Sequence, residues 1–184
     1  RDFATLFFTF VFPAGLLVAL VLSMGQLPSP NGGNSVNEVS SNVISFGVAF
    51  VAVFAGAQHI AAWRENGMLN VLRSAPVDSG NILLAQARVG AGLVIVQAIF
   101  LIVIAVTPWL GMSLIWTAPL ALVGAALGYF CFFGLGVILA NIVPSMTAVT
   151  MLSLIVVIGL GLLGGAMMPL EYMPAWVQEV AIFT

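Results

Sequence analysis

Five long apolar segments constrain this chain more than any other feature of its sequence. They cover residues 6–24, 43–63, 82–106, 120–143 and 146–163. A helix needs about 20 apolar residues to cross the hydrocarbon core of a bilayer, which is roughly 30 Å thick. Each segment is about that long and has no charge near its centre, whereas transmembrane strands would alternate polar and apolar residues. The sequence therefore predicts an all-α, polytopic transmembrane bundle of five spans.

The composition excludes several classes of protein. Charged residues make up only 5% of the chain, whereas about a quarter of the residues of a soluble domain are charged. There is no lysine, which excludes the lysine-containing loop that binds ATP phosphates, and there is no basic stripe for nucleic acid. His59 and Cys131 are the only residues of their kinds. We therefore expect no catalytic residue, no metal site and no cofactor in this chain.

The arginines indicate the orientation of the spans. They are Arg1, Arg64, Arg73 and Arg88. With five spans all four lie on one side of the membrane, and positive residues favour the cytoplasmic side. We expect a cytoplasmic N-terminus, a cytoplasmic loop at 64–81, and an exterior polar loop at 26–42.

Two polar side chains inside the third predicted span are candidates for a substrate pathway. Arg88 either lines such a pathway or extends toward the inner interface, which is the more common behaviour. Gln97 either lines the pathway or makes an interhelical hydrogen bond. In the fourth span, small residues favour close helix packing, within the chain or with a second copy. These glycines are Gly124, Gly128, Gly134 and Gly136.

The loop between the second and third spans has the pattern of a short helix. Met68, Leu69 and Leu72 fall on one helix face, and Pro76 ends the helix near the preceding residues. The predicted cytoplasmic helix has an apolar face and basic ends. It either rests on lipid headgroups or docks into a soluble partner.

The stretch 164–184 is the second unusual region. Its marking residues are Gly164, Gly165, Pro169, Pro174 and Trp176. The prolines interrupt any long helix, and polar and apolar residues alternate irregularly. We expect two short helices on the outer side, which either re-enter the bilayer or lie on its surface.

At these two places the chain resembles the type-2 permeases of ATP-binding-cassette exporters, a family of drug- and antibiotic-resistance and polysaccharide exporters. The first matching residues are Arg64, Glu65, Gly67, Met68, Leu69, Leu72, Arg73 and Pro76. The resemblance implies that 64–76 is a coupling helix that binds a groove of an ATPase subunit, with Gly67 permitting a tight bend and the arginines contacting acidic partner groups. The glycines, prolines and tryptophan of 164–184 resemble the family's re-entrant outer segment.

The resemblance further implies a single permease domain over 1–184, without the family's elbow helix and sixth span, so we expect a chain truncated at both ends. The implied partners are an ATPase subunit that holds ATP and Mg, a second permease copy or homologue, and a lipophilic or lipid-linked substrate. The implied location is the inner or plasma membrane. Two alternatives stay open: a non-transporting membrane anchor or assembly subunit, and a membrane-embedded enzyme with a reactive cluster near His59.

Overall fold

The computed structural model describes residues 7–25, 35–68, 78–114, 116, 118–167 and 173–181. In order, the elements are the π-helical turn η1 (Phe7–Val11), α2 (Phe12–Met24), α3 (Ser35–Glu65), α5 (Ser79–Ala105), α6 (Ala118–Ile142), α7 (Met146–Leu163) and α8 (Ala175–Ala181). Within these ranges five helices, with η1 and α2 counted as one, are long and apolar enough to cross a membrane. The predicted all-α bundle of five spans is confirmed.

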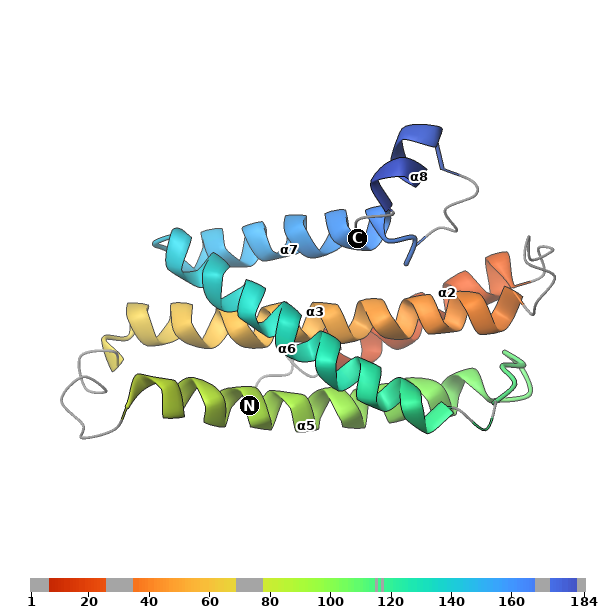
Figure 1. Ribbon diagram of the computed structural model, residues 1–184, viewed down its shortest axis with the longest axis horizontal. Coiled ribbons are helices and arrows are strands. Elements are labelled where there is room, and N and C mark those ends of the chain that lie inside the picture. The colour runs from red at the N-terminus through yellow and green to blue at the C-terminus, as the bar shows by residue number, and fades with distance from the viewer. Residues whose placement is uncertain are drawn as a thin grey trace.

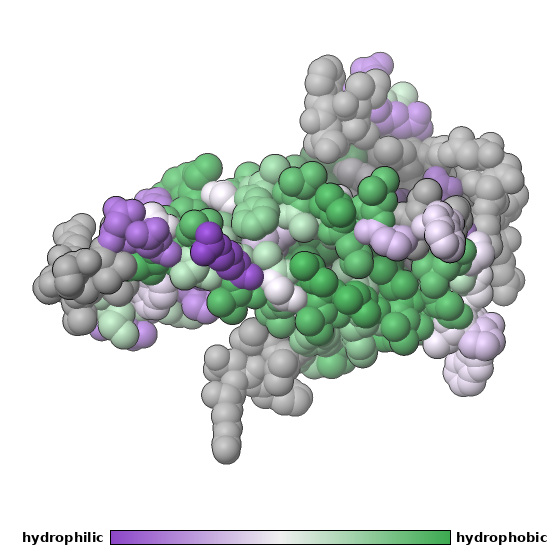
Figure 2. Space-filling view, turned by 60° about the horizontal axis from the view of Figure 1, so that its bottom comes forward, coloured by the Kyte–Doolittle hydropathy of each residue, from purple (hydrophilic) through white to green (hydrophobic). Residues whose placement is uncertain are grey.

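Helix α3 is the centre of the bundle (Figure 1). It contacts α2, α5, α6 and α7. Of its most apolar stretch 56% is buried, compared with 22% to 33% for the other four spans. The remaining surface of the bundle is dominated by apolar side chains, with hydrophilic groups gathered toward its ends (Figure 2). One helix is therefore surrounded by protein, and the others face outward on one side.

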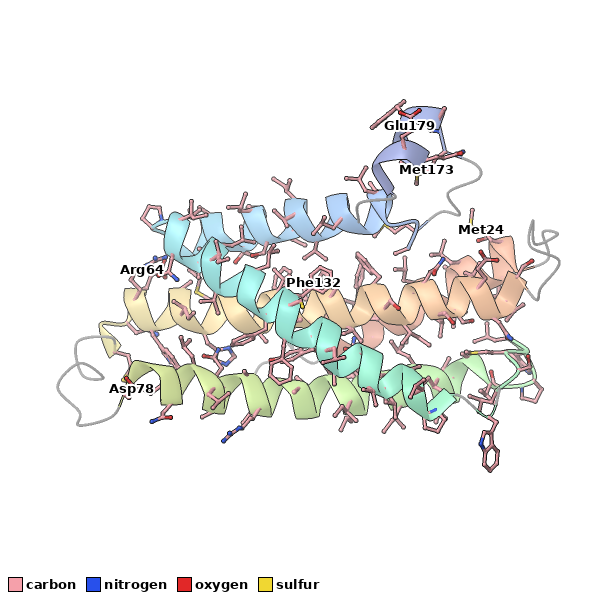
Figure 3. All side chains as sticks on the ribbon, in the orientation of Figure 1. Met24, Arg64, Asp78, Phe132, Met173 and Glu179 are labelled. Atoms are coloured by element: carbon pink, nitrogen blue, oxygen red, sulfur yellow. The ribbon has the colours of Figure 1, made fainter. Side chains whose placement is uncertain are left out.

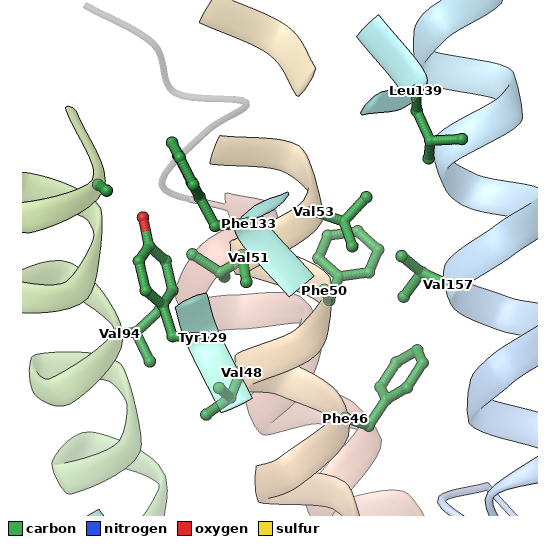
Figure 4. Close-up of a cluster of buried hydrophobic side chains, with 12 residues drawn as sticks. Phe46, Val48, Phe50, Val51, Val53, Val94, Tyr129, Phe133, Leu139 and Val157 are labelled. Carbon is green, nitrogen blue, oxygen red and sulfur yellow. The ribbon is translucent and has the colours of Figure 1, made fainter. Parts of the chain in front are cut away.

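The main hydrophobic cluster forms where α3 meets its neighbours (Figure 4). Phe46 and Phe50 of α3 lie beside Val157 of α7, and Tyr129 and Phe133 of α6 lie toward α5. All five side chains are buried. The aromatic side chains of this cluster come from both α3 and α6 and are among its largest members.

Helices α3 and α6 cross with their backbones in contact. A Cβ atom at Gly136 would overlap the carbonyl oxygen of Val53, and a Cβ at Gly56 would overlap the carbonyl oxygen of Phe133. Only glycine fits at either position without a shift of the helices. The packing role predicted for Gly136 is confirmed, and its counterpart on α3 is Gly56.

The other glycines of α6 face away from the chain. No atom lies within 4 Å of a Cβ built at any of three positions, which are Gly124, Gly128 and Gly134. The sequence left open packing within the chain or with a second copy, and among the described residues these three glycines make no close contact with another helix, because α6 presents a different face to α3. Contact with a second copy stays a prediction.

Helix α3 begins earlier than the sequence indicated. It starts at Ser35, so the loop predicted over 26–42 was too long at its C-terminal end. The polar residues there are used in helical structure: the Asn37 amide donates to the Ser113 hydroxyl at 2.8 Å, and its Oδ1 accepts from the Ser113 N–H at 2.9 Å. Val39 in the same turns is buried. A contact with the loop after α5 therefore stabilises the polar start of α3.

Candidate functional site at the end of the central helix

One end of the bundle collects the charged groups that the sequence singled out (Figure 3). Arg64 and Asp78 lie at this end, which we call the Arg64 end, whereas Met24 and Glu179 lie at the opposite end. At the Arg64 end α3 finishes, α5 begins, and residues 143–145 connect α6 to α7. The Asp78 carboxylate accepts from the Gly80 N–H at 3.1 Å and so caps the start of α5.

Arg64 binds the end of α6. Its Nη1 donates to the carbonyl oxygen of Ala140 at 2.8 Å, and its Nη2 donates to that of Val143 at 2.6 Å. The usual helical donor for the Ala140 carbonyl would be the N–H of residue 144, but Pro144 has none. Ala140 is fully buried, so Arg64 satisfies a carbonyl that would otherwise lack a donor. The guanidinium also places positive charge at the negative end of the α6 dipole.

Glu65 binds the start of α7. Its Oε1 accepts from the N–H of Met146 at 2.6 Å, and Met146 is the first residue of α7. The Ser145 side chain accepts from the Ala148 N–H at 3.2 Å as the N-cap. The first N–H groups of a helix have no partner within it, and a carboxylate suits the positive end of its dipole. Adjacent residues of α3 thus hold both sides of the α6–α7 turn.

The chain turns directly after this pair. Gly67 has φ +68°, a left-handed conformation that costs other L-residues roughly 1–2 kcal/mol, and this is the conformation that the expected tight bend requires. Met68 follows and is 46% exposed. The rest of the predicted coupling helix lies outside the described residues, so its structure stays a prediction. Those residues are Leu69, Leu72, Arg73 and Pro76.

The two pathway candidates lie on different sides of α5. Arg88 is exposed, whereas Gln97 is fully buried. The Gln97 Nε2 donates to the Gly47 carbonyl of α3 at 3.4 Å, which is the interhelical hydrogen bond that the sequence offered as the alternative to a pathway role. The structure does not bring these two residues together, and a pathway role for either stays a prediction.

The outer candidate segment lies at the opposite end. Helix α7 is followed by Gly164–Gly165, where the Gly165 carbonyl accepts from the Asn42 side chain at 3.4 Å. Pro174 immediately precedes α8, whose Trp176 is 64% exposed. One short helix is described where two were expected, and Pro169 lies outside the described residues. Re-entry into the bilayer stays a prediction.

Sequence reasoning missed the partners of Arg64 and Glu65. The resemblance to type-2 permeases placed both in the coupling helix, among the residues that bind a soluble partner. The signal that could have found the contact was Pro144: a proline after a long helix leaves a carbonyl four residues earlier without its donor. The sequence alone could not show which side chain supplies that donor.

Comparisons with known proteins place the chain in context. The family described as ABC-2 type transporter matches residues 1–183. The inner membrane transport permease YhhJ of Escherichia coli (strain K12) is 26% identical over 135 residues, and the match covers 73% of this chain and 36% of that relative. The inner membrane transport permease YhhJ of Shigella flexneri matches with the same identity and coverage. The match thus spans 36% of the length of each of these curated relatives. No solved structure matches significantly.

Proposed function

The chain belongs to the ABC-2 type transporter family, and from this premise we propose that it is the transmembrane permease part of an ATP-driven exporter. The resemblance to type-2 permeases that two motifs indicated is confirmed by the family match. Similarity to an inner membrane transport permease supports a transport role in that membrane. A separate ATPase subunit would bind ATP and Mg, because this chain has no lysine for a phosphate-binding loop.

The observation that carries the proposal is the connection between the most buried helix and an exposed turn. Helix α3 has 31 residues, about 46 Å at 1.5 Å per residue, whereas the hydrocarbon core is roughly 30 Å thick. Beyond its end the chain bends at Gly67 and exposes Met68. A partner that displaces the part of the predicted coupling helix beyond this bend, which we call the docking segment (residues 68–76), therefore pulls on the helix that contacts α2, α5, α6 and α7.

The outer surface of the spans and the charges of the chain support the proposed second copy, substrate class and orientation. Among the described residues no atom lies within 4 Å of a Cβ built at Gly124 or Gly128 of α6, and a second permease copy or homologue would pack there or nearby to enclose a pathway. The spans carry few charges, which suits a lipophilic or lipid-linked substrate. The arginine distribution favours a cytoplasmic docking segment and N-terminus.

The test of this function is a double substitution, Leu69→Asp with Leu72→Asp. Burying two leucines contributes about 3–6 kcal/mol, and the two aspartates would place charge in the partner's groove. We expect co-purification of the ATPase from the neighbouring reading frame to fall at least about tenfold, which is 1.4 kcal/mol, and transport to fall with it. Abundance in the membrane should stay near normal, because the spans are unchanged.

A matched control adds the same two charges to the opposite face of the segment. Asn70→Asp with Ser74→Asp are spaced four apart and lie away from the leucine face on a helix. This variant should keep the ATPase bound. Full recovery of the ATPase with the leucine variant would contradict the proposal. Reduced membrane abundance with unchanged ATPase recovery would instead favour a segment that rests on lipid.

A further inference from the structure

We propose that Arg64 and Glu65 are positioning residues that join the α6–α7 turn to the end of α3, so that α3, α6 and α7 move as one body when the docking segment is displaced. The inference rests on the proposed function, because a partner must displace that segment. It assigns these two residues to a contact inside the chain, in place of the partner contact that their charges suggested.

Both charged side chains already make hydrogen bonds within the chain. The Arg64 guanidinium donates to the carbonyl oxygens of Ala140 and Val143, and the Glu65 carboxylate accepts from the Met146 N–H. The guanidinium is partly buried, and its Nε has no partner among the described residues. These two hydrogen bonds use two of the five N–H donors of the guanidinium and fix its position at the end of α6.

The α6–α7 turn depends on α3. Pro144 removes the donor that α6 would otherwise supply to the Ala140 carbonyl, and that residue is fully buried. Loss of Arg64 would leave a buried acceptor unsatisfied, which costs more than an ordinary hydrogen bond contributes. On the other side of the turn, Glu65 holds the first N–H of α7. Each charge also has the favourable sign for the helix end that it meets.

Hydrogen bonds between the helices indicate which of them are held to α3. Helix α7 has a further tie to it, because the Gln58 Nε2 donates to the Thr150 hydroxyl at 2.8 Å, and that hydroxyl donates to the Met146 carbonyl at 2.9 Å. Helix α5 also has a hydrogen bond to α3, because the Gln86 Nε2 donates to the Ala55 carbonyl at 2.8 Å, but the start of α5 is capped by its own Asp78. The geometry thus predicts that α6 and α7 are held to the last turn of α3, whereas the start of α5 is held by its own cap.

The test measures amide hydrogen exchange over residues 141–150 in the full chain, in lipid nanodiscs without the ATPase. Glu65→Ala should raise exchange at Met146 about tenfold, the scale of one lost hydrogen bond in local opening. Glu65→Gln keeps an acceptor oxygen and should raise it less. The double variant R64E, E65R swaps the two side chains. It keeps the net charge of the chain but reverses the sign of the charge at both helix ends, so it should raise amide hydrogen exchange most.

A control at the opposite end separates this effect from general loosening. Asn37→Ala removes the hydrogen bonds between α3 and Ser113, and it should leave exchange at 141–150 unchanged. With the ATPase bound, addition of ATP should alter exchange at 141–150 in the unsubstituted chain. In the R64E, E65R variant that response should be lost, while ATPase recovery stays within about twofold, a small fraction of an ordinary coupling energy.

Two results would overturn the proposal. One is unchanged exchange at 141–150 in every variant. The other is loss of ATPase binding in the R64E, E65R variant with normal hydrogen exchange at 141–150. That result would show that the two residues contact the ATPase and not the α6–α7 turn. If the unsubstituted chain recovers no ATPase at all, the proposed function fails, and exchange in the chain alone still decides for or against the joint.

Discussion

At the scale of single residues, the few charges of this chain serve the ends of helices. Arg64 binds the carboxyl end of α6, Glu65 binds the amino end of α7, and Asp78 caps α5. Each charge has the sign that the helix dipole favours. In a chain with 5% charged residues, these three charges thus lie where backbone groups at helix ends lack partners.

Gly67 provides the sharpest test at this scale. Its φ of +68° strains any residue with a side chain, and no atom of the described part of the chain lies within 4 Å of an added Cβ, so the requirement shown here is one of backbone conformation. Gly67→Ala should disfavour the bend by roughly 1–2 kcal/mol and reduce ATPase co-purification about tenfold. Gly67→Asn, which tolerates the left-handed region better, should recover part of that binding. Equal binding by the alanine variant would show that the bend is not needed.

At the scale of elements, apolar length predicts most of the architecture. The predicted fifth span, 146–163, coincides with α7, because a proline and an N-capping serine precede it and glycines follow it. The start of α3 was missed because Asn37 and Ser113, which contact each other, are 76 residues apart. The same limit applies to the site: Arg64 and Glu65 meet groups 76 to 81 residues away. The resemblance to type-2 permeases implied the bend at Gly67, but no local pattern predicts such distant contacts.

The crossing of α3 and α6 provides a test at this scale. Gly136→Ala would force the two backbones apart, and overpacking of this kind costs about 1–3 kcal/mol. Gly134→Ala adds the same methyl group on the same helix where no atom lies within 4 Å. In a thermal unfolding assay by size-exclusion chromatography, the first variant should unfold at a lower temperature and the second should match the unsubstituted chain. Equal shifts would contradict the backbone contact.

At the scale of the whole molecule, the bundle is arranged around one helix. Helix α3 is the most buried span and contacts four others, and the only described route from it to the docking segment passes through Gly67 and Met68. A displacement of that segment therefore reaches the rest of the bundle through α3. This arrangement fits the proposed function, in which a partner outside the membrane displaces the docking segment.

The most direct test of the account is which side of the membrane the docking segment faces. Single cysteines at Met68 and Trp116, which are 46% and 97% exposed, would be placed in a Cys131→Ser background, because Cys131 is itself exposed. The arginine distribution predicts that a membrane-impermeant maleimide labels the Met68 variant only from the cytoplasmic side, and the Trp116 variant only from the exterior. Labelling of Met68→Cys from the exterior, or of both variants from one side, would contradict a permease driven by a cytoplasmic ATPase.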